Sequence, residues 1–216
     1  MENWEYENII GSGATSYVFS GYFNGKPVAI KWMTKKDAQK EMKNIRLIRQ
    51  GNDYTLPLSY RNIPIIVSEN NLLLPYSHIC GRWFLEDIVG EGQFPPIKTL
   101  GGPGLVKDRR YAKYKLKGTG KDLLSCLMVF PLVKGDLRGV DLRKHKVEEV
   151  IRDIKQALNI LHARDPPIYH ADLALRNIFY YFDEDGNVHY LLGDFGKIKL
   201  QDYDIQEELK KIISKF

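Results

Sequence analysis

The first 32 residues place two turn signals between strand-forming segments, and this pattern restricts the start of the chain to an antiparallel sheet. Residues 17–23 are mostly aromatic and β-branched, and residues 27–32 form a second apolar segment. Between them, Asn24-Gly25 is typical of a two-residue hairpin. An apolar pair at 9–10 leads into a glycine-rich turn. We therefore predict a three-stranded meander before residue 33.

The remainder of the chain mixes helical and strand patterns, which predicts an α+β fold. Apolar residues recur at helix spacing over 36–49 and again from Val147 to about His162, where the second helix is expected to end. The last residues, 205–216, are expected to form a short helix. The strand candidates are 63–67, 72–74, 124–130, 178–182 and 188–192, the last two forming a hairpin.

Composition is that of a folded chain. The 216 residues are 44% hydrophobic and 27% charged, which suits one domain or two small lobes that share a cleft. The longest apolar run, 123–133, is about half of what a bilayer crossing needs. Residues 1–5 lack a signal-peptide core, and Cys80 and Cys126 do not make a disulfide framework or a metal site. We expect a cytoplasmic protein without a transmembrane segment.

The net charge of +5 is concentrated in one segment. Residues 98–121 contain eight basic residues and one acidic residue, whereas the rest of the chain has 24 basic and 26 acidic residues. A nucleic-acid-binding protein needs a continuous basic face, so we expect no sequence-specific nucleic-acid partner. The basic stretch could bind an acidic acceptor or an anionic surface, and the alternative is a solvated loop.

Four short motifs follow one another in a fixed order, each beside a predicted strand or helix. They are GSGATSYV at 11–18, VAIK at 28–31, HADLALRN at 170–177 and DFG at 194–196. In this combination the sequence resembles the protein-kinase superfamily from about residue 9 to residue 199. The resemblance implies a single bilobal kinase-like domain over 1–216. Its β-rich N-lobe would span about 1–130 with an insertion around 76–122, and its reduced helical C-lobe about 131–216.

The resemblance implies that the N-lobe binds ATP. Glycines in the first motif let backbone N–H groups approach the phosphates, although Ser16 stands where the family usually has a third glycine. Lys31 lies in an apolar strand, where a cation is costly unless it is paired. By resemblance it binds phosphates and pairs with Glu41, whose alternative is a solvated helix charge. The implied nucleotide-binding residues are Gly11, Ser12, Gly13, Val18, Ala29, Lys31, Glu41, Phe130, Leu132 and Asp136.

The third and fourth motifs imply the catalytic groups. Asp172 would orient or deprotonate an acceptor hydroxyl, and Arg176 would replace the lysine of serine/threonine kinases, as in the tyrosine-kinase pattern. Asn177 and Asp194 would hold Mg²⁺, which prefers oxygen ligands. His170 is expected to brace the loop and not to act as a base. The implied catalytic set is Asp172, Lys31, Arg176, Asn177 and Asp194.

Residues 130–133 are the expected hinge, with Phe130 at the gatekeeper position and Asp136 near the ribose. Residues 74–76 are a rival hinge, which would leave a long connection before the catalytic loop.

Three departures from the family pattern bear on function. Ala171 replaces the arginine that contacts a phosphorylated activation loop, which favours constitutive activity. Ala174 replaces the usual lysine, so the acceptor residue type stays open. Only 20 residues follow Gly196, without an Ala-Pro-Glu element. This layout is typical of a minimal kinase, and a truncated chain is the alternative.

We expect an ATP- and Mg²⁺-dependent phosphotransferase that acts on a hydroxyl, most readily one on a protein. The alternatives are a small-molecule or glycan kinase and a catalytically silent decoy or scaffold. The decoy reading predicts losses at the lysine, aspartate or asparagine positions, and none is lost here.

Overall fold

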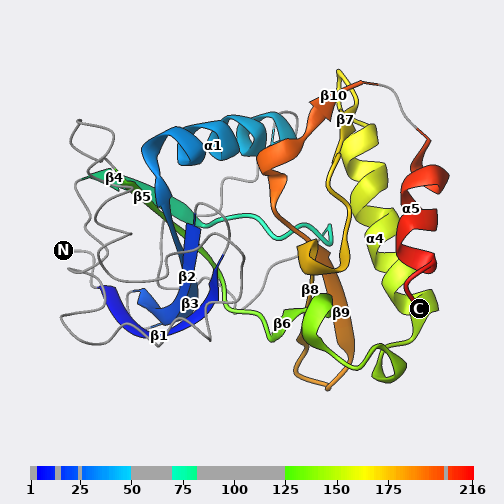
Figure 1. Cartoon of the computed structure of the whole chain (residues 1–216), viewed down its shortest axis with the longest axis horizontal. Helices are drawn as coiled ribbons and strands as arrows, with labels where there is room; N and C mark the ends of the chain where they lie inside the picture. Colours follow the sequence, from blue (N-terminus) through cyan, green and yellow to red (C-terminus); the bar gives the residue numbers. More distant parts are fainter. Residues whose placement is uncertain (1–3, 13–15, 24–25, 50–69, 82–124, 202–203) are drawn as a thin grey trace, which may run out of the picture. The chain divides into compact units, whose positions relative to one another are not determined.

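The computed structural model describes residues 4–12, 16–23, 26–49, 70–81, 125–201 and 204–216. These residues mix helices and strands, so the predicted α+β class is confirmed (Figure 1). The chain divides into two units, which are described separately below. The first comprises residues 1–39 and 75–132, and the second comprises 40–74 and 133–216. No helix within the described ranges is long and apolar enough to cross a membrane.

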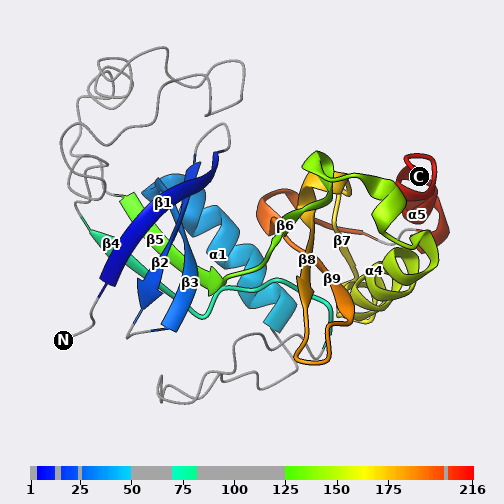
Figure 2. The same cartoon turned by 90° about the horizontal axis from the view of Figure 1, so that it is seen from below.

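The first unit is built on a five-stranded sheet in the order β1-β2-β3-β5-β4 (Figure 2). Strands β2 and β3 are antiparallel with Phe23 opposite Lys26, which confirms the predicted two-residue hairpin. The central strands β3 and β5 supply the core, including the fully buried Ile30 and Val129. The strands are β1 (Trp4–Ser12), β2 (Ser16–Phe23), β3 (Lys26–Thr34), β4 (Ser77–Gly81) and β5 (Ser125–Pro131).

The edge strand β4 corrects two expectations. Residues 77–81 were placed in the insertion at 76–122, but they pair with β5 as part of the sheet. Cys80 lies directly opposite Cys126 in this pairing, and the two form a disulfide with their Cα atoms 4.1 Å apart. The expectation that these cysteines make no disulfide framework missed this bond, because they lie 46 positions apart in the sequence and only the strand register brings them together. Since disulfides persist in oxidising compartments, the cysteines no longer support a cytoplasmic location.

Helix α1 (Lys35–Arg49) follows β3 and agrees with the predicted helix at 36–49. Its start is capped by Thr34, whose hydroxyl accepts a hydrogen bond from the Asp37 backbone N–H at 3.2 Å and donates one to the Asp37 carboxylate at 2.7 Å. Met42, Ile45 and Ile48 are buried, as their spacing predicted. The boundary between the two units falls within this helix.

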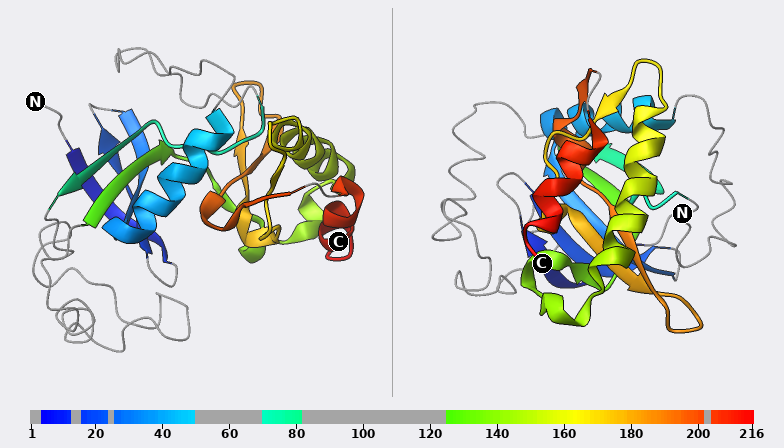
Figure 3. Two further views of the ribbon diagram at one scale, coloured as in Figure 1. Left: turned by 90° about the horizontal axis from the view of Figure 1, so that it is seen from above. Right: turned by 90° about the vertical axis from the view of Figure 1, so that its right-hand side faces the viewer.

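The second unit combines a long helix with a small sheet. Helix α4 (Val147–His162) has the bounds that its apolar spacing predicted, and α5 (Ile205–Ile213) packs beside it (Figure 3). The predicted hairpin is also confirmed, because β8 and β9 are antiparallel over five residue pairs. The strands are β6 (Gly135–Asp136), β8 (Ile178–Phe182) and β9 (Val188–Leu192) in one sheet, and β7 (Ile168–Tyr169) and β10 (Lys199–Leu200) in another.

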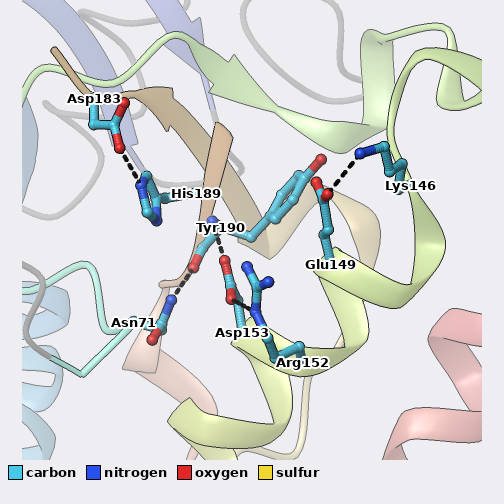
Figure 4. Close-up of polar contacts among 8 residues, drawn as sticks. All are labelled: Asn71, Lys146, Glu149, Arg152, Asp153, Asp183, His189 and Tyr190. Atoms are coloured by element: carbon cyan, nitrogen blue, oxygen red, sulfur yellow. Dashed lines mark hydrogen bonds and ion pairs between the residues drawn. The ribbon is translucent and has the colours of Figure 1, made fainter. Parts of the chain in front are cut away.

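Strand β9 is an edge strand whose outer backbone groups are bonded by other segments. The Tyr190 backbone N–H donates to the Asp153 carboxylate at 3.0 Å, and its carbonyl accepts from the Asn71 side chain at 2.9 Å (Figure 4). Residues 72–74 were predicted to be a strand, but only Leu72 forms a bridge, to Leu192. Buried backbone groups need partners, so these contacts hold β9 in place just before the DFG motif.

Candidate active site

The catalytic-loop motif of 170–177 lies between β7 and β8 in the second unit. Its last residues form a 3₁₀ turn, η5 (Leu175–Asn177). Ala171 has a left-handed φ of 61°, which is unusual for a residue with a side chain. Strained backbone of this kind persists where surrounding contacts hold it, and it clusters at functional sites.

Asp172 receives hydrogen bonds on both carboxylate oxygens. Arg176 donates to Oδ1 at 2.6 Å, and Lys197 donates to Oδ2 at 3.1 Å. The Asn177 side-chain amide donates to Oδ2 at 3.2 Å and to the Asp172 backbone carbonyl at 2.7 Å. The structure therefore brings Asp172, Arg176 and Asn177 together as the motif implied, and it adds Lys197.

The electrostatic environment keeps Asp172 ionised. Partial burial raises the pKa of this carboxyl, but the hydrogen bonds from Arg176 and Lys197 outweigh it and leave the pKa below its ordinary value. The Asp172 side chain is 17% exposed, so an incoming hydroxyl can still reach it. Such a carboxylate is a weak base, and it suits orienting a hydroxyl better than strong proton abstraction.

Asn177 and Asp194 offer oxygen atoms to a metal ion. The Asn177 nitrogen Nδ2 is committed to Asp172, which leaves Oδ1 as the donor atom of this buried amide. The Asp194 carboxylate is exposed and makes no hydrogen bond or ion pair with any described residue, and its backbone φ is 63°. The two residues are linked through Gly193, whose N–H donates to the Asn177 carbonyl at 2.9 Å.

This donor set fits Mg²⁺ better than a tightly caged ion. No group of three or more His, Cys, Asp or Glu side chains that could hold a metal occurs among the described residues. Mg²⁺ is commonly bound by one or two protein oxygens together with water and substrate phosphates, and an Asn/Asp pair supplies that number.

A buried core braces the DFG motif. His170 is fully buried, and its Nε2 lies 3.1 Å from the Gly193 carbonyl oxygen. Its ring packs edge-on against Phe195 with centroids 5.5 Å apart, and burial lowers its pKa. The Asn44 side chain on α1 donates to the Phe195 carbonyl at 2.7 Å. His170 is therefore a structural member of the loop, and it is not placed to act as an exposed base.

Gly193 lies where no side chain fits, and this gives a stability prediction. A Cβ at this position would lie 2.9 Å from the Phe179 ring and 3.3 Å from the Leu73 Cβ. We expect Gly193→Ala to lower the free energy of unfolding by about 1–3 kcal/mol, because the Phe179 ring and the backbone at position 193 must move apart to admit the new methyl group. Urea unfolding measures the change. Gly139→Ala is the control, because a Cβ there meets nothing within 4 Å. Equal effects of the two substitutions would contradict the packing argument.

The first unit gathers its candidate residues on one face of the sheet. Gly11 is opposite Val18, Val18 is opposite Lys31, and Ala29 is opposite Phe130. Directly opposed residues share a face, as do Ala29 and Lys31 two positions apart. The reverse face carries Phe19, Ile30 and Val129, which are at most 1% exposed. Of the five candidates on this face only Ala29 is buried, although Met128, which lies opposite Lys31, is buried on the same face.

The other predicted residues have varied surroundings. Glu41 is buried on α1 with 3% exposure, and its pairing with Lys31 stays a prediction. The Asp136 carboxylate caps the short helix η3 (Leu137–Gly139) by accepting from the Arg138 N–H at 2.8 Å, which sequence reasoning did not foresee. Ser12 is the last residue of β1. Gly13 and the basic stretch at 98–121 lie outside the described residues.

The connections between the units bear on the two candidate hinges. The chain passes from the first unit to the second between Leu132 and Val133, within the predicted hinge at 130–133. The rival at 74–76 contains another passage, between Leu74 and Pro75, but it leads into β4.

Lys197 is the functional candidate that sequence reasoning missed. It ends the 3₁₀ turn η6 (Phe195–Lys197), directly after the DFG residues. The signal in the sequence was a lysine directly after the DFG motif. In the motif at 170–177, Arg176 is the one Lys or Arg residue, so a second cation near Asp172 could have been sought there.

Compared with protein-family models and with curated proteins, the sequence gives no match. The kinase resemblance therefore stands on the four motifs and their order.

Proposed function

We propose that the protein is a kinase-like phosphotransferase that moves the γ-phosphate of ATP to a hydroxyl group in the presence of Mg²⁺. The observation that carries the proposal is the arrangement around Asp172. One loop presents a carboxylate bonded to Arg176 and Asn177, and the Asn177 carbonyl is bonded to the residue before Asp194. Phosphoryl transfer needs these groups: an acceptor-orienting carboxylate, oxygen ligands for a metal and cations near the reacting phosphate.

Each residue has a defined part in this proposal. Asp172 accepts a hydrogen bond from the acceptor hydroxyl and orients its oxygen for attack on the γ-phosphorus, while Arg176 offsets negative charge beside it. As the new oxygen–phosphorus bond forms, the bond from the γ-phosphorus to the bridging oxygen of ADP breaks and ADP leaves. The hydroxyl proton, which becomes more acidic as the bond forms, passes to Asp172. Asn177 and Asp194 would hold Mg²⁺, which when bound neutralises phosphate charge. Lys31 would contact the α- and β-phosphates from the half-open face of the sheet, where Val18 and Ala29 offer an apolar wall to adenine.

The acceptor is proposed to be a protein hydroxyl, with a glycan or small-molecule hydroxyl as the alternative. Ala171 leaves no arginine to bind a phosphorylated activation loop, so activity should not require an upstream kinase. A cytoplasmic location stays a proposal, which the Cys80–Cys126 disulfide does not support.

The proposal predicts that protein made in bacteria transfers labelled γ-phosphate from ATP to an acceptor, and that chelating Mg²⁺ abolishes the transfer. Generic proteins, peptides and sugars are offered in parallel, so the labelled species identifies the acceptor class. Thermal unfolding with and without ATP–Mg²⁺ reports nucleotide binding separately. Binding without any transfer would favour the decoy or scaffold. Neither binding nor transfer would refute the proposed nucleotide site.

A further inference from the structure

Lys197 is held in position by a well-anchored backbone. The preceding Phe195 is 1% exposed, and its carbonyl accepts the hydrogen bond from Asn44. Two residues later, Lys199 pairs with Tyr169 in the β7–β10 sheet. The Lys197 backbone is therefore fixed on both sides, while its side chain is 64% exposed and reaches Asp172 Oδ2.

Asp172 has more cationic partners than its single charge requires. Arg176 and Lys197 both pair with it, at 2.6 and 3.1 Å, and their side chains are 45% and 64% exposed. The other nearby carboxylate, that of Asp194, pairs with neither cation. One positive charge beside Asp172 is therefore available to an incoming anion.

The bond from Lys197 is the one that an acceptor can displace. The acceptor hydroxyl needs an oxygen of Asp172, and Oδ1 is taken by the shorter bond from Arg176. The Lys197 bond to Oδ2 is longer and more exposed, and exposed ion pairs contribute little to stability. Once displaced, the ammonium group remains within reach of the acceptor and gains from a new negative partner.

We propose that Lys197, with Arg176, forms an anion subsite that selects protein acceptors carrying an acidic side chain next to the reactive hydroxyl. This inference rests on the proposed phosphotransfer function and names its substrate class. The donor phosphates have their own partners in that proposal, Lys31 and the metal ligands, so Lys197 is left for the acceptor. The net charge of +7 over residues 98–121 independently favours an acidic acceptor. Lys197 is thus a specificity-determining residue.

The test compares two acceptor peptides that differ only in a glutamate or a glutamine beside the hydroxyl. For the wild-type protein, we expect a higher kcat/KM with the glutamate peptide. Lys197→Gln should reduce this preference by about 10-fold, the order of one charge-assisted hydrogen bond, and should leave the KM for ATP unchanged. Lys197→Arg should retain most of the preference, because the charge is kept.

Lys199→Gln is the matched control. Lys199 is an exposed cation two residues further along the chain, and it does not contact Asp172. Its replacement by glutamine therefore removes the same charge without removing a bond to Asp172. An equal loss of preference in the two glutamine variants would overturn the proposal in favour of a diffuse charge effect. A preference that is unchanged in Lys197→Gln would also overturn it, as would a phosphorylated monosaccharide that is preferred over the acidic peptide.

A binding measurement separates this proposal from the proposed function. Fluorescence anisotropy of the labelled glutamate and glutamine peptides, without ATP, is measured for wild type and Lys197→Gln. Preferential binding of the glutamate peptide that depends on Lys197 supports the subsite even if no phosphate is transferred. Transfer without a Lys197-dependent preference in binding or turnover leaves the function standing and refutes the subsite.

Discussion

Replacing Asp172 by asparagine is expected to reduce phosphate transfer by about 1000-fold, within the range for losing a group that handles a proton in the transition state. Asparagine keeps the size of the side chain, but it removes the charge that pairs with Arg176 and Lys197. It also puts an N–H group where an oxygen could accept the acceptor's hydrogen bond. The initial rate of transfer from labelled ATP measures the loss, and thermal stabilisation by ATP–Mg²⁺ should persist.

Asp141→Asn is the matched control for this substitution. Like Asp172, Asp141 has a carboxylate that pairs with an arginine, in this case Arg143 at 2.8 Å. It lies away from the motif at 170–177, where it caps the 3₁₀ turn η4 (Leu142–Lys144). We expect its variant to transfer phosphate at the wild-type rate. If Asp172→Asn kept more than a tenth of the wild-type rate, Asp172 would not be the group that orients the acceptor.

The second large effect concerns stability and involves a carboxylate on α5. Glu208 is 2% exposed, and neither of its oxygens has a hydrogen-bond partner among the described residues. Burial raises its pKa to about 7, although Lys211 and the nearby Ala171 backbone N–H act in the opposite direction. An ionised carboxylate in this position lacks the partners that normally offset its burial.

Glu208→Gln is expected to raise the free energy of unfolding at pH 8 by up to about 3 kcal/mol relative to wild type. The folded-state pKa of about 7 lies above the ordinary value of 4.5, so folding favours the protonated form. Wild-type stability should therefore fall as the pH rises from 4.5 to 7 and level off above it. At pH 4 to 5 the side chain at position 208 is neutral in the folded state of both the wild type and Glu208→Gln. The difference in their free energy of unfolding should therefore nearly vanish.

Urea unfolding at pH 4.5 and pH 8 measures this difference. The control is Glu207→Gln, which removes the same charge from the same turn of α5 at an exposed position. It should change stability by less than about 0.5 kcal/mol at either pH. A benefit from Glu208→Gln that is the same at both pH values would contradict ionisation as its cause.

The elements that could be predicted from the sequence are those whose signal is local. The bounds of α4 and of the β8–β9 hairpin follow from apolar spacing and a turn between two strands, which involve neighbouring residues only. The resemblance groups Asp172, Arg176 and Asn177 in one catalytic set because they lie within one short motif, and the three residues are in contact.

The features that could not be predicted depend on the register between distant segments. Cys80 meets Cys126 only because β4 and β5 pair with these residues opposite each other. Residues 72–74 have strand-like composition, yet they form one bridge to β9, whose edge is also bonded by Asn71 and by Asp153 of α4. No periodicity in the sequence encodes either arrangement.

Side-chain pattern along the chain is enough to predict the α+β class, the main helices and hairpins, and the residue types proposed for phosphate chemistry. Tertiary contacts, in contrast, bring Lys197 to Asp172 across 25 positions and bury Glu208 with no hydrogen-bond partner among the described residues. They also place Gly11, Val18 and Lys31 on one face of a sheet. Those results depend on which segments pack together, and packing energy is set by contacts between residues far apart in the chain.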